Sequence, residues 1–63
     1  MYVYEGKLCR IIGSFRESFF NDIKEANPNK VIEIEMIDDD DTQEVCISDV
    51  ELYSMYRYLR AIV

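Results

Sequence analysis

The stretch from residue 31 to residue 50, VIEIEMIDDDDTQEVCISDV, alternates apolar and polar residues on both sides of four consecutive aspartates. Alternation of this kind, rich in β-branched residues and interrupted by turn-forming Asp, is typical of a half-buried antiparallel hairpin. We expect one face of the hairpin to be buried, and it carries Ile32, Ile34, Met36, Val45 and Ile47. The other face carries Val31, Glu33, Glu35, Ile37, Glu44, Cys46 and Ser48.

Residues 1–12, before this hairpin, are rich in strand-forming side chains. Gly6-Lys7 fits a type II′ turn, which has glycine at its first central position. That turn predicts a short hairpin that pairs residues 2–5 with residues 8–12. A single bent strand is the competing interpretation, and the sequence does not separate the two.

A helix is predicted over about residues 15–26. Ser14 and Glu17 have the spacing of a capping box, in which each side chain accepts a hydrogen bond from the other residue's amide. Asn27-Pro28-Asn29 ends the helix, because the residue before a proline avoids the helical conformation. Helical spacing puts Phe15, Phe19, Ile23 and Ala26 on one face, with Phe20 at its edge.

A second helix is predicted over about residues 49–61. Ser48 and Glu51 form another capping box, and Ile47 and Leu52 have the spacing of a hydrophobic staple. Asp49 and Glu51 lie where the helix dipole favours negative charge. A full apolar stripe then follows at helical spacing: Leu52, Met55, Tyr56, Leu59, Ile62 and Val63.

These elements predict a single α+β domain over residues 1–63, with the order β(β)-α-β-β-α. We expect a small antiparallel sheet of three or four strands with two helices packed on one face. The alternative is a small SH3-like barrel, in which a hairpin is followed by a short helical turn. A continuous C-terminal helix to residue 61 would argue against the barrel.

A chain of 63 residues has a small stability margin, because it buries only about 60% of its unfolded surface. Cys9 and Cys46 do not form the pattern of a secreted disulfide scaffold, and we expect both thiols to be free. No segment reaches the roughly 20 apolar residues of a membrane span, and the N-terminus lacks the features of a secretory signal. A cytoplasmic protein that does not bind membranes is the expectation.

Charge is segregated along the chain. Residues 31–56 contain nine acids and no Lys or Arg, whereas the remaining residues contain four acids and seven bases. The net charge of −6 therefore combines a segment of −9 with a remainder of +3. A field of this kind repels nucleic acid and membrane phosphates and attracts basic protein surfaces. Direct binding of nucleic acid is not expected.

Little in the sequence indicates an enzyme. Histidine, the commonest general base and metal ligand, is absent, and two glycines cannot build a phosphate-binding loop. No cofactor is expected. Asp38, Asp40, Thr42 and Glu44 alternate as in an EF-hand loop, but Gln43 stands where that loop needs glycine. The sequence therefore predicts no metal site, although a calcium-dependent turn remains a minor alternative.

The acids of the hairpin allow two interpretations. They either keep a small domain soluble or form a surface that occupies a basic groove on another protein. Outward side chains on a strand recur about every 6.6–6.8 Å, which is roughly two phosphate steps of a nucleic-acid strand. Tyr53 and Tyr58, near Arg57 and Arg60, are candidate apolar anchors for such a partner. The candidate partner-binding residues are Glu33, Glu35, Asp38, Asp39, Asp40, Asp41, Glu44, Tyr53 and Tyr58.

In size, charge and compactness, the chain is similar to small inhibitor proteins of phages and mobile elements, including anti-restriction and anti-CRISPR types. This resemblance is one of composition and transfers no residues. The functional hypothesis is a non-enzymatic interaction module that places its acidic hairpin on a basic surface of a nucleic-acid-handling protein. The alternative is a structural protein that assembles as a homodimer through Phe20 or the C-terminal helix, without an inhibitory role.

Overall fold

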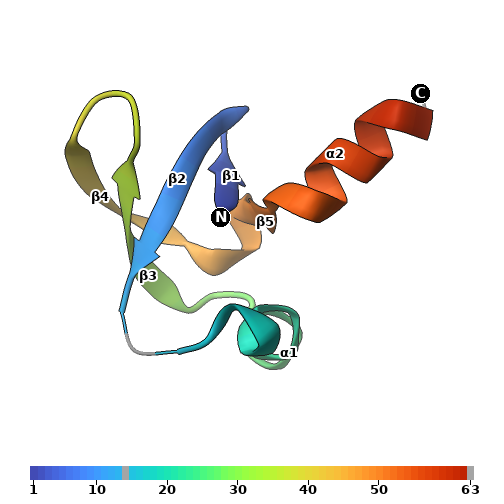
Figure 1. Ribbon diagram of the computed structural model, residues 1–63. Coiled ribbons are helices and arrows are strands. Elements are labelled where there is room, and N and C mark those ends of the chain that lie inside the picture. The colour runs from blue at the N-terminus through green and yellow to red at the C-terminus, as the bar shows by residue number, and fades with distance from the viewer. Residues whose placement is uncertain (14, 63) are drawn as a thin grey trace.

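The structure is an antiparallel sheet of five strands with two α-helices (Figure 1). This computed structural model describes residues 1–13 and 15–62, with side chains except at positions 58, 59, 61 and 62. The predicted α+β class is confirmed, but the sheet has five strands rather than three or four. The elements are β1 (Tyr2–Tyr4), β2 (Lys7–Ile12), the 3₁₀-helix η1 (Glu17–Phe19), α1 (Phe20–Ala26), β3 (Val31–Met36), β4 (Asp41–Cys46), the 3₁₀-helix η2 (Ile47–Asp49), β5 (Val50–Leu52) and α2 (Tyr53–Ile62).

The strands lie in the order β4-β3-β2-β1-β5, with every neighbouring pair antiparallel. Strands β1 to β4 form a meander, and β5 returns to pair with the free side of β1. The short helical turn η2 before β5 is typical of the SH3-like barrel given above as the alternative. The helix α2 after β5 is not expected in such a barrel, so the fold has features of both predicted architectures.

The first twelve residues form a hairpin, and the single bent strand is therefore wrong. Tyr4 pairs with Lys7 across a two-residue turn made by Glu5 and Gly6. Both turn residues have positive φ, 51° and 78°, which is the type I′ geometry rather than the type II′ geometry at Gly6-Lys7. Type I′ places glycine second, so the turn begins one residue earlier than the sequence suggested.

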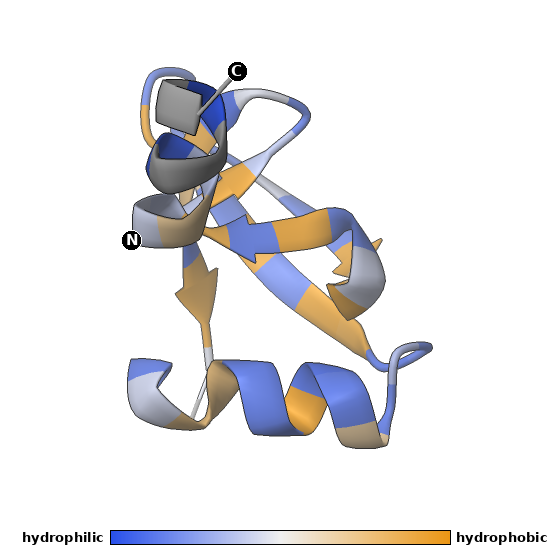
Figure 2. Ribbon diagram, turned by 90° about the vertical axis from the view of Figure 1, so that its right-hand side faces the viewer, coloured by the Kyte–Doolittle hydropathy of each residue, from blue (hydrophilic) through white to orange (hydrophobic). Residues whose placement is uncertain are grey.

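The core lies on one face of the sheet, and the predicted alternation of the β3–β4 hairpin is confirmed. Ile32, Ile34 and Met36 are buried beside Val45, and Ile47 at the start of η2 is fully buried. The other strands and α1 complete this core with Tyr2, Cys9, Phe20 and Val50. Figure 2 shows the resulting alternation of hydrophobic and hydrophilic residues along the strands.

The first helix ends at Ala26, as predicted, but begins differently. Residues 17–19 form a 3₁₀ turn, which advances about 120° per residue instead of 100° and so rotates the buried face. Phe20 is therefore fully buried, with its ring centroid 4.9 Å from that of Tyr2, whereas Phe19 is 52% exposed. The expectation that Phe19 faces the core is wrong. The Ser14 cap lies outside the described residues, and the Glu17 carboxylate instead accepts from the Met1 ammonium at 2.7 Å.

The second helix begins at Tyr53, not at residue 49. Residues 47–49 form η2 and residues 50–52 form β5, so Ser48 and Glu51 do not lie at the start of an α-helix. The prediction that they form a capping box is wrong. The reason is long-range pairing: β5 bonds to β1, which buries Val50 completely. Burial on the sheet outweighs the local helical pattern. Leu59, Ile62 and Val63, which belong to the predicted stripe, have side chains outside the described set.

The two helices do not form one layer on one face of the sheet. Helix α1 crosses one end of the sheet, and α2 continues from β5 and projects away from the strands (Figures 1 and 2). Lys24 on α1 donates a hydrogen bond to the Val50 carbonyl at 2.7 Å, and this bond connects α1 to β5. The β3–β4 hairpin lies on the opposite side of the sheet from α2 (Figure 1).

Candidate functional site

The acidic hairpin, residues 31–46, carries two glutamates that face each other directly. Glu33 on β3 pairs with Glu44 on β4, and both side chains are exposed. The Ile47 amide donates to the Lys30 carbonyl at 2.8 Å, so this end of the ladder starts with a hydrogen-bonded pair. Alternation along the ladder makes Glu33–Glu44 a non-hydrogen-bonded pair, with Cα atoms about 4.5 Å apart. Two like charges are thus held close together on the outer face.

The next outward glutamate is neutralised within the protein. Glu35 pairs across β2 and β3 with Arg10, and Arg10 Nε lies 3.0 Å from Glu35 Oε1. The corresponding β2 neighbour of Glu33 is Ile12, an uncharged side chain that cannot form an ion pair with it. The sequence interpretation missed this difference because it depends on the register between β2 and β3, which no local pattern reveals.

The four aspartates occupy the tip of the hairpin. Asp38, Asp39 and Asp40 lie in the turn, and all three are exposed. Asp40 has φ of +50°, a left-handed conformation that Asp tolerates better than most residues do. Asp41 begins β4 opposite Met36, on the core side of the sheet, yet it too is exposed at the tip. The tip thus presents its acids to solvent, although not all from one face.

The tyrosines predicted as anchors do not join the acidic hairpin. Tyr53 begins α2 and is 37% exposed, and its amide donates to the Met1 carbonyl at 3.0 Å. This contact puts Tyr53 beside β1 and β5, at the far end of the sheet from β4. The side chain of Tyr58 lies outside the described set. The structure therefore brings together the acids but separates them from Tyr53.

Ion pairing leaves most of the acidic segment unneutralised. Within residues 1–13 and 15–62, the ion pairs between described side chains and termini are Met1–Glu17 and Arg10–Glu35. Of the nine acids between residues 31 and 56, only Glu35 takes part in either. The hairpin therefore keeps six of its seven acids without an ion pair to a described side chain, whereas Asp49 and Glu51 lie near the opposite edge of the sheet.

The two cysteines are free thiols in different environments. Cys9 is fully buried in the core, and burial raises the pKa of its thiol. A raised pKa makes a thiol a poorer nucleophile at neutral pH. Cys46 is half-buried on the outer side of β4, and its Sγ lies 3.0 Å from both the Pro28 carbonyl oxygen and the Ser48 hydroxyl. Neither thiol has an adjacent base among these contacts.

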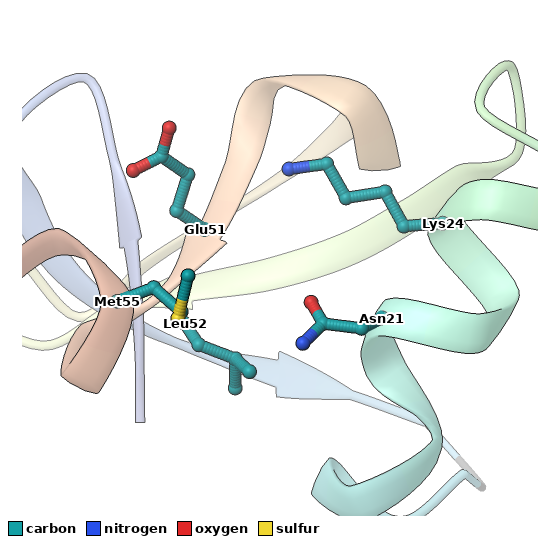
Figure 3. Close-up of a pocket in the computed structure, with 5 residues that line it drawn as sticks. All are labelled: Asn21, Lys24, Glu51, Leu52 and Met55. Carbon is teal, nitrogen blue, oxygen red and sulfur yellow. The ribbon is translucent and has the colours of Figure 1, made fainter.

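A small cleft lies between α1, β5 and the start of α2 (Figure 3). Its volume of about 150 Å³ is below the roughly 300 Å³ or more of typical small-molecule sites. The Lys24 amine at its rim is already bonded to the Val50 carbonyl. The lining residues are Asn21, Lys24, Glu51, Leu52 and Met55.

The described residues contain no group of three or more Cys, Asp or Glu side chains arranged to hold a metal ion. None of the helices in this part of the chain is long and apolar enough to cross a membrane.

Comparisons with protein-family models, curated proteins and solved structures found no match for this chain.

Proposed function

We propose that the chain is a non-enzymatic interaction module whose acidic hairpin binds a basic surface on a protein partner. The observation that carries this proposal is the Glu33–Glu44 pair. Like charges directly opposite each other in a sheet destabilise it by about 0.2–1 kcal/mol. A partner that supplies Lys or Arg at this row converts the repulsion into attraction, whereas the protein supplies Ile12 there.

The kind of partner follows from the sign and distribution of the charge. The exposed turn aspartates add a second group of acids at the tip of the hairpin, and the Glu35 row that Arg10 neutralises lies between them and the Glu33–Glu44 row. Proteins that handle nucleic acids carry basic grooves that bind regularly spaced phosphates. We propose such a protein as the partner, with the acidic hairpin taking the place of the nucleic-acid backbone and so inhibiting or regulating it.

A homodimer is the second candidate function. Phe20 cannot mediate it, because this side chain is fully buried in its own core. Several large apolar side chains elsewhere are about half exposed, among them Phe19 on η1 and Met55 on α2. Sedimentation of the purified protein tests this candidate: a monomer at high concentration contradicts it, and a dimer lost in Phe19→Ser or Met55→Ser variants supports it.

Affinity capture with three matched baits tests the first proposal. The baits are the natural chain, a hairpin variant (Glu33→Gln, Asp39→Asn, Glu44→Gln) and a control variant (Glu5→Gln, Asp22→Asn, Glu25→Gln). Both variants lose three exposed carboxylates, but only the first loses them from the hairpin. The lysate is treated with nuclease, so that proteins are not captured indirectly through nucleic acid.

We expect the natural chain and the control variant to capture the same nucleic-acid-binding protein at low salt, and the hairpin variant to lose it. High salt should weaken capture, because exposed charges are screened over about 8–10 Å at physiological ionic strength. Equal recovery by all three baits, or recovery indifferent to salt, would contradict the proposal. A captured partner without nucleic-acid-binding activity would contradict only the narrower assignment of partner class.

A further inference from the structure

The outer edge of β4 presents backbone groups that the protein does not use. Strand β4 is the last strand of the sheet on its side. The hydrogen-bonded pairs of the β3–β4 ladder are Ile32–Val45, Ile34–Gln43 and Met36–Asp41, by alternation from the Ile47–Lys30 bond. The N–H and C=O groups of Thr42 and Glu44 therefore point away from β3. In the described part of the chain, no hydrogen bond from outside the ladder reaches them.

At the opposite edge of the sheet, the outward backbone groups of Val50 on β5 are hydrogen-bonded to other parts of the protein. Strand β5 is only three residues long, and the Val50 carbonyl on its outer side accepts the hydrogen bond from Lys24. The Val50 amide donates to the Ile47 carbonyl within η2, and α2 begins directly after Leu52. The two edges thus differ: β5 is short and capped, whereas β4 has six residues and stays open.

Charge determines which strand can pair with the open edge. Strand β4 contains two acids, Asp41 and Glu44, and no base, so a second copy of β4 paired with it would place negative charge beside negative charge. Such like-charge contacts oppose self-pairing, which is a common protection of exposed edges. The same acids favour an extended segment rich in Lys or Arg, because opposite charges on neighbouring strands attract.

We propose that the β4 edge binds a basic, extended segment of a protein partner as a sixth strand. This inference rests on the proposed function, which needs a basic surface, and adds how that surface is bound. Main-chain bonds to Thr42 and Glu44 supply affinity, and alternate side chains supply specificity. Outer-face side chains recur at every second residue, so the segment carries Lys or Arg at alternate positions beside Thr42 and Glu44.

A short peptide of alternating lysine and threonine is the probe for this inference. A peptide of equal charge that alternates lysine and proline is its control, because proline has no N–H and cannot complete a ladder. The readouts are the dissociation constant at low salt and the hydrogen exchange of the Thr42 and Glu44 amides in the natural protein.

Two variants of the protein separate backbone pairing from charge. Thr42→Pro removes an outward N–H while keeping every carboxylate, and edge strands tolerate proline where the N–H faces solvent. The pair Glu33→Gln, Glu44→Gln keeps the backbone edge and removes charge. Each change should weaken binding of the lysine–threonine peptide by about 2- to 10-fold, the amount expected for one hydrogen bond or ion pair.

The expected result is binding of the lysine–threonine peptide with slower hydrogen exchange at the Thr42 and Glu44 amides. Both variants should bind this peptide more weakly, and the natural protein should bind the lysine–proline peptide more weakly.

Equal binding of the two peptides with unchanged exchange at both amides would overturn strand addition. If charge removal still weakened binding in that case, the proposed function would survive. Absence of peptide binding at low salt would overturn strand addition, and binding unaffected by charge removal would count against the proposed function as well. Because exchange is measured in the natural chain, the inference stays testable even if Thr42→Pro does not fold.

Discussion

Glu33 and Glu44 face each other across β3 and β4, one row away from the ion pair that Arg10 makes with Glu35. The two rows of the outer face are therefore unlike: one is neutralised by the protein itself and the other is not. This difference leads to predictions about stability as well as about binding.

Removing charge from the unneutralised row should stabilise the fold. We expect Glu33→Gln to raise the free energy of unfolding by about 0.2–1 kcal/mol at low salt, because it relieves repulsion with Glu44. Glu35→Gln is the matched control on the same strand and face, and it should give no gain because it breaks the ion pair with Arg10. Urea denaturation measures both, and equal effects of the two substitutions would contradict the assignment.

The contact between Lys24 and β5 should contribute more to stability than an ordinary surface lysine does. Lys24 Nζ donates to the Val50 carbonyl and lies 5.7 Å from the centre of the Phe20 ring. We expect Lys24→Met to lower the free energy of unfolding by about 1–3 kcal/mol. Lys30→Met, at an exposed position, is the control and should change it by no more than about 0.5 kcal/mol. Similar melting temperatures of the two variants would show that Lys24 does not hold α1 on β5.

The rotation of the first helix by its 3₁₀ turn predicts unequal effects at two adjacent phenylalanines. Phe20→Leu should lower the free energy of unfolding by about 1–2 kcal/mol, because it opens space in the core and removes the ring contact with Tyr2. Phe19→Leu should cost less than about 0.5 kcal/mol at its exposed position. The reverse order in thermal denaturation would mean that Phe19, not Phe20, fills the core.

Burial of Cys9 makes the fold sensitive to alkaline pH. Desolvation raises the pKa of this thiol above its ordinary 9.0, so the folded state keeps a proton that the unfolded chain loses. The contribution to stability is therefore full below pH 9.0 and is lost as pH rises toward the higher folded pKa. Burial raises the pKa of the Tyr2 hydroxyl as well, which adds a similar loss at higher pH.

Denaturation of the natural chain and of Cys9→Ala across this pH range isolates the thiol. We expect the stability of the natural chain to fall more steeply above pH 9.0 than that of the variant. Parallel profiles would show that the buried thiol does not titrate differently in the two states.

Sequence patterns predicted the parts of the fold that depend on local alternation. The β3–β4 hairpin follows from the alternation of Ile32, Ile34 and Met36 with glutamates, since a shift by one residue would expose all three. Asn27-Pro28 likewise ended the first helix at the expected place.

The remaining features depend on contacts between distant segments. Helical spacing from Leu52 onward suits α2, but it gives no sign that Val50 would be buried by pairing with β1. The same applies to the candidate site. Sequence alone identified its acids, whereas the neutralisation of Glu35 by Arg10 depends on the β2–β3 register.

The salt dependence of partner binding tests the central claim most directly. The affinity of the captured partner is measured at low and high salt for the natural chain, the Glu33–Asp39–Glu44 hairpin variant and the Glu5–Asp22–Glu25 control variant. We predict that the natural chain and the control bind tightly at low salt and weaken steeply with added salt, and that the hairpin variant binds weakly with little salt dependence. Equal affinity and equal salt dependence for the two variants would contradict the claim that the acidic hairpin is the binding surface.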